Sequence, residues 1–126
     1  MKIYVAAKYE AKEEVRHVYK KLFDAGHTIT YDWTQSDEND ERGRKHEIAI
    51  REVLAVETCD AFVLLPHERG KGQYTELGVA LANRKPIFIY CTGVSRDWNI
   101  FLHHTACVYV TRLMDLLDRL RFLEAV

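Results

Sequence analysis

Two kinds of hydrophobic pattern alternate along this chain. Short runs of consecutive apolar residues, rich in β-branched and aromatic side chains, predict strands. Longer stretches with apolar residues three or four positions apart predict helices. The predicted strands cover residues 2–7, 27–33, 61–66, 86–91 and 106–111, and the predicted helices cover residues 11–25, 44–58, 74–83 and 112–124.

The two central apolar runs indicate the fold class. Residues 62–65 and 87–90 are apolar at every position rather than at alternate positions. Such strands are typical of a parallel sheet that is buried on both faces. With the alternation of strands and helices, they predict an α/β fold: a flavodoxin-like, doubly wound, five-stranded parallel sheet with helices on both faces. The chain shows no linker and no repeat, so we expect residues 1–126 to form a single domain.

Composition and charge restrict the partners that we expect. Of the 126 residues, 48% are hydrophobic and 29% are charged, which is the balance of an ordinary globular protein. The formal charge is −1, so we expect neither polymeric nucleic acid nor a membrane surface as a partner, because both favour a basic face. The odd number of widely spaced cysteines in apolar runs predicts buried thiols in a reducing, cytoplasmic compartment.

The most informative segment for chemistry is RGKGQYTELGVALA, residues 69–82. Gly70 and Gly72 allow a ligand to approach the backbone closely and leave amide groups exposed, and Lys71 adds a positive charge. We expect the helix to begin after them, with Glu76 in its first turn, where the helix dipole favours an ionised carboxylate. Spacing alone leaves open that Glu76 only stabilises the helix start. The segment lacks the P-loop pattern and the third glycine of a dinucleotide fingerprint.

A second acid, Glu52, lies on the preceding predicted helix. If Val53 and Leu54 face the sheet, Glu52 lies at the edge of the buried face, as Glu76 does on its own helix. The carboxyl ends of the first and third strands are adjacent in this topology, so both acids are expected to border one crevice. Two carboxylates that flank a glycosidic bond can act as nucleophile and acid/base, although glutamate is common on helix surfaces.

Other side chains follow the same strand ends. They are Ala7, Lys8 and Tyr9 after the first strand and Asp32 and Trp33 after the second. Trp33 and Tyr74 are suited either to stacking on a base or to packing. His46 and His67 are either proton carriers or surface residues. The charged segment 35–44 is either a mobile loop near the site or a plain surface loop, and His103 and His104 lack the spacing of zinc ligands, so we expect no metal site.

Three segments resemble the nucleoside 2-deoxyribosyltransferase superfamily, which includes the deoxynucleoside monophosphate N-glycosidases. They are GQYTELGVALA (72–82) with the following Lys85-Pro86, IYVAA (3–7) and GHTITYDW (26–33). Glu52, eight residues before the Asp60 that leads into the third strand, resembles a family position that usually has Asp. The resemblance covers most of the chain, and its Glu-Leu-Gly segment is the most specific part.

The resemblance implies an enzyme that uses no cofactor and acts on a small-molecule nucleoside or nucleotide. Glu76 would be the nucleophile that forms a glycosyl ester, from which water or a second base takes the sugar. Glu52 would orient the sugar or transfer protons. Asn99 resembles an asparagine that contacts the sugar and that a neighbouring subunit supplies in several members. A homodimer or higher homo-oligomer is therefore implied.

Two departures from the family pattern leave the substrate open. Gly70 stands where transferases have Asp and phosphate-binding glycosidases have Ser, and Ala7-Lys8-Tyr9 replaces a Ser/Arg-rich phosphate loop. Lys8, Lys71 and the loop amides could still meet a 5′-phosphate. Two alternatives therefore stand beside the N-glycosidase or transferase: a nucleotide-binding or signalling module that has lost turnover, and an NAD-type glycohydrolase.

Overall fold

A computed structural model of the protein describes residues 1–36, 44–91, 93 and 95–126. The strands in this part of the chain form one parallel five-stranded sheet in the order β2-β1-β3-β4-β5. This order confirms the predicted flavodoxin-like fold. The strands are β1 (Lys2–Ala6), β2 (Thr28–Ile29), β3 (Ala61–Leu64), β4 (Ile87–Tyr90) and β5 (Cys107–Val110).

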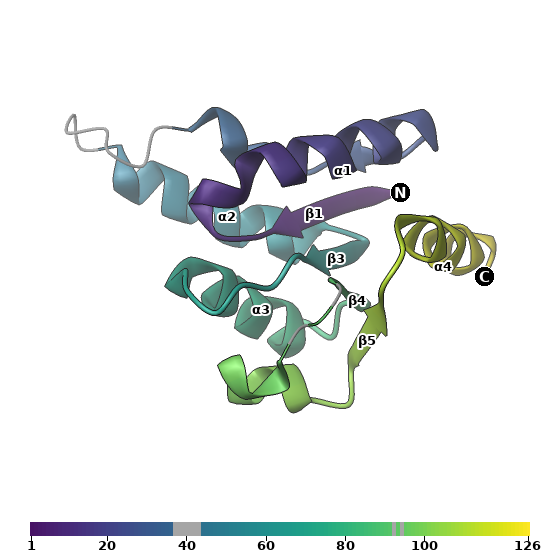
Figure 1. Cartoon of the computed structure of the whole chain (residues 1–126). Coiled ribbons are helices and arrows are strands. Elements are labelled where there is room, and N and C mark those ends of the chain that lie inside the picture. Colours follow the sequence, from purple (N-terminus) through teal and green to yellow (C-terminus); the bar gives the residue numbers. More distant parts are fainter. Residues whose placement is uncertain (37–43, 92, 94) are drawn as a thin grey trace.

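Helices cover both faces of the sheet (Figure 1). They are α1 (Lys12–Asp24), α2 (Lys45–Thr58), α3 (Lys71–Ala82) and α4 (Leu113–Ala125). The helices α2 and α3 pack against each other on one face, and α1 and α4 cover the other. Right-handed crossovers explain this arrangement. The chain crosses from β1 to β2 toward one edge of the sheet, and from β2 to β3 and then β4 toward the other edge. Because the direction reverses, the connecting helices lie on opposite faces. Short 3₁₀ helices, η1 (Tyr9–Ala11), η2 (Trp33–Gln35), η3 (Arg96–Trp98) and η4 (Ile100–His103), lie in the connections.

The core is formed by the strands whose apolar runs are continuous. Every residue of β3 and the last four residues of β1 are buried. The register pairs Ile3 with Ala61 and Ala6 with Leu64, so the two strands end side by side at their carboxyl ends. The predicted face of α1 is confirmed as well, because Val15 and Leu22 are fully buried.

Three predicted details are wrong. Val53 and Leu54 point away from the sheet, with 40% and 55% of their surface exposed, and α2 buries Ala55 and Val56 instead. The predicted strand 27–33 is paired only at Thr28–Ile29, because the chain then turns into η2. Finally, α3 begins at Lys71, three residues earlier than predicted, so Gly72 lies inside the helix rather than in the loop.

Among the helices that the structure describes, none combines the length and the apolar character that a membrane span requires.

The charged segment 35–44 falls mostly outside the described residues, since only its two ends are described.

Candidate active site

The candidate active site lies where the strand order reverses, beyond the carboxyl ends of β1 and β3. In doubly wound sheets this point is the usual location of a ligand crevice. The structure has a cavity of about 180 Å³ there. We call it the acid crevice. Its lining consists of Ala7, Lys8, Tyr9, Glu10, Trp33, Glu52, Gly70, Lys71, Gly72, Gln73 and Glu76. Most of the site residues predicted from the sequence therefore come together in one crevice.

Glu76 lies in the second turn of α3, on the side that faces β1. Its side chain is buried, with 8% exposed, and accepts a hydrogen bond from the hydroxyl of Tyr4. The predicted place in the first turn is wrong, because α3 begins earlier than expected. The hydrogen bond from a buried tyrosine, rather than the helix dipole, therefore stabilises the carboxylate of Glu76.

Tyr4 is a site residue that the sequence did not reveal. It is fully buried in β1, and its ring stacks on Phe62 of the neighbouring strand, with 6.0 Å between ring centroids. Burial, together with the negative charges of Glu76 and Glu52, raises the pKa of Tyr4 well above its ordinary value. The hydroxyl thus stays protonated at neutral pH and remains a hydrogen-bond donor to Glu76.

Glu52 reaches the same crevice from α2. It lies on the half-buried side of that helix, and its charge is close enough to Tyr4 to contribute to the raised pKa. The structure therefore places both predicted acids at one crevice, although the residues that bury α2 are different from those we expected. A pair of carboxylates at one site is what most glycosidases use.

The loop that precedes α3 approaches the β1–α1 connection so closely that only glycine fits at position 70. Gly70 has φ of 100°, which is strained for any residue with a side chain. A Cβ atom there would lie 2.6 Å from Cβ of Lys8 and 2.8 Å from Nε2 of Gln73. The departure from Asp or Ser at this position therefore has a structural reason in this chain.

Gln73 braces the same loop and was also missed in the sequence. Its side chain is 1% exposed. The amide Nε2 donates to the carbonyl oxygens of Arg69 (2.6 Å) and Gly70 (2.9 Å), and Oε1 accepts from the backbone N–H of His67 at 3.0 Å. This one residue holds both sides of the loop against α3.

The residues after β1 and β2 form the opposite wall of the crevice. Trp33 is buried, and its indole N–H donates to the carbonyl oxygen of Val5 at 2.6 Å, so its ring is held in place by β1. The rings of Tyr9 and Trp33 lie 6.4 Å apart, and the Tyr9 hydroxyl donates to the carbonyl oxygen of Ser36. Asp32 does not line the crevice; instead it caps η2 by accepting from the backbone N–H of Thr34.

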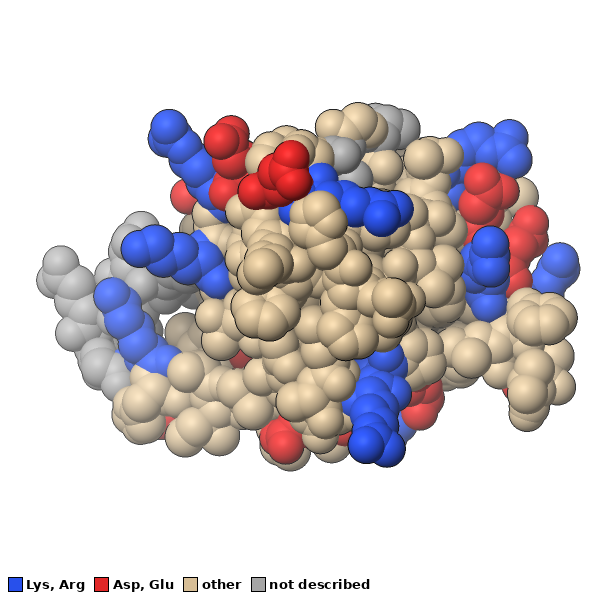
Figure 2. Space-filling model, turned by 90° about the horizontal axis from the view of Figure 1, so that it is seen from below, with Lys and Arg blue, Asp and Glu red and all other residues tan. Residues whose placement is uncertain are grey.

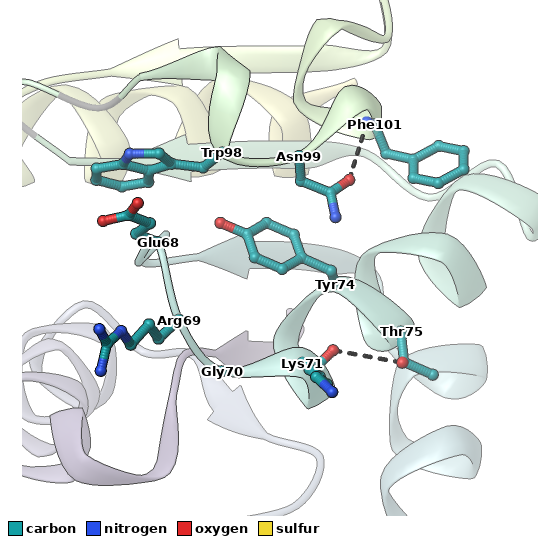
Figure 3. Close-up of a pocket in the computed structure, with 9 residues that line it drawn as sticks. All are labelled: Glu68, Arg69, Gly70, Lys71, Tyr74, Thr75, Trp98, Asn99 and Phe101. Atoms are coloured by element: carbon teal, nitrogen blue, oxygen red, sulfur yellow. Dashed lines mark hydrogen bonds between the residues drawn. The ribbon is translucent and has the colours of Figure 1, made fainter.

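Two predicted binding residues, Tyr74 and Asn99, lie apart from the acids. They line a second cavity of about 780 Å³, which we call the aromatic cavity, between the start of α3 and the η3–η4 segment (Figure 3). Burial raises the pKa of Tyr74 to about 12, and its hydroxyl donates to the carbonyl oxygen of His67. Asn99 accepts from the backbone N–H of Phe101 at 2.9 Å and caps η4.

The predicted proton carriers are both outside the acid crevice. His67 hydrogen-bonds the carbonyl oxygen of Leu65 and lies 4.0 Å from Glu14, in a separate small cavity. Burial is the main cause that lowers its pKa. His46 is exposed near the start of α2. Within the described part of the chain, no group of three His, Cys, Asp or Glu residues is arranged to hold a metal ion.

The chain matches a known protein family and is similar in structure to known proteins. The model of the nucleoside 2-deoxyribosyltransferase family matches residues 3–106. Among curated proteins, no significant match was found. A CMP N-glycosidase from Clostridium botulinum is similar in structure, with a TM-score of 0.66 and 16% identity over 96% of this chain and 99% of that one. A 2-deoxyribosyltransferase from Bacillus psychrosaccharolyticus has a TM-score of 0.68 and 19% identity over 94% and 91% of the two chains.

A further similar structure corrects one expectation. DNA processing protein A from Helicobacter pylori, a protein with a single-stranded DNA binding mode, has a TM-score of 0.69 and 12% identity over 97% of this chain and 80% of that one. Our exclusion of polymeric nucleic acid from the net charge is therefore wrong, because a protein of this fold binds DNA. Net charge is a sum and does not report how charges are distributed. In the view of Figure 2, side chains of both signs lie around a broad uncharged area.

At these identities, the structural likeness shows a shared fold. The match to the family model is the stronger finding, since it covers β1 through η4 and includes both acids of the crevice. The protein belongs to the nucleoside 2-deoxyribosyltransferase family.

Proposed function

We propose that this protein cleaves or transfers at the N-glycosidic bond of a nucleoside or nucleoside 5′-monophosphate, with Glu76 as the nucleophile. The observation that carries the proposal is the pairing of a buried carboxylate, held by Tyr4, with a second carboxylate, Glu52, in one crevice. Membership of the family supports the same class of reaction. Two of the similar structures, a CMP N-glycosidase and a 2-deoxyribosyltransferase, support the same class of reaction.

In the first step, a carboxylate oxygen of Glu76 attacks the anomeric carbon of the sugar. The bond from this carbon to the base nitrogen breaks, and its electron pair leaves with the base. Glu52 in its acid form donates a proton to the departing base, and the sugar remains as an ester on Glu76. The positive charge that develops on the sugar in the transition state is stabilised by the negative charge of the attacking Glu76 carboxylate.

In the second step, Glu52 accepts a proton from water or from an acceptor base. The activated acceptor attacks the same anomeric carbon, and the bond to Glu76 breaks with its electron pair returning to the carboxylate. Two displacements retain the configuration of the sugar. Tyr4 takes no proton in this scheme; it is a positioning residue that holds Glu76 through its hydrogen bond.

The test is release of free base from a panel of nucleosides and 5′-monophosphates. We expect the wild type to release base and Glu76→Ala to lose about a thousandfold or more of the rate, as expected for loss of a covalent nucleophile. Glu57→Ala is the matched control, because Glu57 is an exposed glutamate on α2 outside the crevice. A folded Glu76→Ala protein with wild-type activity would refute the role of Glu76, and a wild type that binds nucleotides tightly without releasing base would favour a binding module.

A further inference from the structure

The acid crevice and the aromatic cavity adjoin each other at the start of α3. Gly70 and Lys71 line both of them. The acid crevice, at about 180 Å³, is below the range of roughly 300–1,000 Å³ in which ligand sites usually fall, whereas the aromatic cavity, at about 780 Å³, lies within it. The crevice has room for the sugar and its scissile bond, and the larger space next to it is unused by the proposed reaction.

Three aromatic side chains line the larger cavity: Tyr74, Trp98 and Phe101. Trp98 is half-buried, and 52% of Phe101 is exposed, so ring faces are available to a planar ligand. The hydroxyl of Tyr74 is held by His67, which fixes the orientation of its ring. Stacking of bases on aromatic rings is the usual basis of sequence-tolerant nucleotide binding.

Polar groups in the aromatic cavity suit the edge of a nucleobase. The oxygen of the Asn99 amide accepts from Phe101, and its nitrogen points toward Tyr74 and Lys71 in Figure 3. Glu68 lies next to Trp98 at the other side of the cavity (Figure 3). An amide and a carboxylate are the side chains that pair with the donor and acceptor atoms of base edges.

Positive charge lies where the two cavities meet. Lys71 lines both, Arg69 lines the aromatic cavity, and Lys8 lines the acid crevice. Gly70 and Lys71 lie at the boundary of the two spaces, because they line both. A base bonded directly to the anomeric carbon lies close to Glu76, whereas a phosphate link gives a second base the length to reach the neighbouring cavity past Lys71, which lines both spaces.

We propose that the aromatic cavity binds a second nucleobase that is joined through phosphate to the nucleoside reacting at Glu76. The substrate class is then a dinucleotide rather than a mononucleotide. This proposal rests on the proposed function for the identity of the reacting half. The link can be a pyrophosphate, as in a 5′,5′-dinucleotide, or a 3′,5′-phosphodiester, as at the end of an oligonucleotide; both present the same base-phosphate-nucleoside arrangement.

The first measurement is calorimetric binding to the Glu76→Ala protein, so that turnover cannot interfere. The probes are the four common 5′-monophosphates and, for each base, the pyrophosphate-linked and the 3′,5′-linked dinucleotide. For the preferred base we expect one dinucleotide to bind at least about tenfold more tightly than its monophosphate, the factor that corresponds to stacking of one base. The tighter of the two dinucleotides identifies the link.

Variants of the cavity then locate the second base. In the Glu76→Ala background we expect Trp98→Ala and Phe101→Ala to reduce the ratio of dinucleotide to monophosphate affinity by about fivefold or more. The matched control is Phe122→Ala, because Phe122 is 73% exposed on α4, outside both cavities. Circular dichroism verifies that each variant is folded. A dinucleotide advantage below about twofold, or one that survives both cavity variants, would overturn the proposal.

Base release by the wild type, measured in parallel, separates this inference from the proposed function. If monophosphates release base but no dinucleotide binds more tightly, the second-base site is wrong and the proposed function stands. If a dinucleotide binds more tightly through Trp98 and Phe101 but no substrate releases base, the proposed function is wrong and the binding site stands.

Discussion

Replacing Gly70 with alanine tests the close approach between the loop before α3 and the β1–α1 connection. The new Cβ would lie 2.6 Å from Cβ of Lys8 and 3.2 Å from its Cα. Because these atoms belong to or adjoin the backbone, a change of side-chain rotamer cannot relieve the contact. The added methyl group must therefore push the two walls of the acid crevice apart.

Two costs add up for this substitution. A residue with a side chain at φ of 100° loses about 1–2 kcal/mol relative to glycine. Overpacking of a tight contact costs about 1–3 kcal/mol more. The free energy of unfolding should therefore fall by about 2–5 kcal/mol. At about 4 °C per kcal/mol for a chain of this length, the melting temperature should fall by about 8–20 °C.

The assay is thermal unfolding followed by circular dichroism, with Gly78→Ala as the matched control. Gly78 lies inside α3, and a Cβ atom there meets no atom within 4 Å. Alanine at this position should raise stability by about 0.5–1 kcal/mol, because glycine is a poor helix former. If Gly70→Ala melts within about 2 °C of the wild type, the close approach to Lys8 is not as the structure has it, and our explanation for Gly at this position fails.

Three further predictions follow from individual contacts. Tyr4→Phe removes the hydrogen bond to Glu76, which is worth about 1.5–3 kcal/mol for a charged acceptor. Base release should therefore slow by about 10- to 150-fold, while the melting curve still shows a folded protein. An unchanged rate would contradict the positioning role. Gln73→Ala removes three hydrogen bonds from the loop and should lower the free energy of unfolding in urea by about 2–4 kcal/mol, whereas a loss under 1 kcal/mol would show that the loop does not depend on them. Burial, followed by the nearby N-terminal ammonium, lowers the pKa of His27 in the folded state, so the unfolded state binds the proton more tightly and stability falls as the pH drops below about 6.5. His27→Gln should lose less stability than the wild type between pH 7 and pH 5 in urea titrations, and equal losses would refute this assignment.

The sequence predicted those elements in which one interpretation of the hydrophobic pattern was clearly better than the others. The helix α1 has a single apolar face, and the continuous apolar runs of β1 and β3 can only be buried. In α2, by contrast, Ile50, Val53, Leu54 and Val56 lie on several sides of the helix. Which side faces the sheet then depends on tertiary packing, and our choice of Val53 and Leu54 was wrong.

The site could be predicted in outline because strand order brings the ends of β1 and β3 together. The contacts that define it could not be predicted. Tyr4 and Glu76 are 72 positions apart, and only the pairing of β1 with β3 and the packing of α3 bring them into contact. Gln73 looked like a loop residue, because Gly70 and Gly72 just before it suggested that the helix began later. The signal available for Tyr4 was a tyrosine within a strand expected to be buried, whose hydroxyl needs a partner.

The role of Glu76 as nucleophile is tested most sharply by finding the residue that carries the sugar in the intermediate. A nucleoside with fluorine at the 2′ position in the arabino configuration slows loss of the sugar from a glycosyl ester, so the ester accumulates. Intact-mass and peptide-mapping measurements after incubation should then show one added sugar per chain, located on Glu76 and absent from Glu76→Ala. A sugar on any other residue, or release of one equivalent of base with no sugar on the protein, would contradict the account.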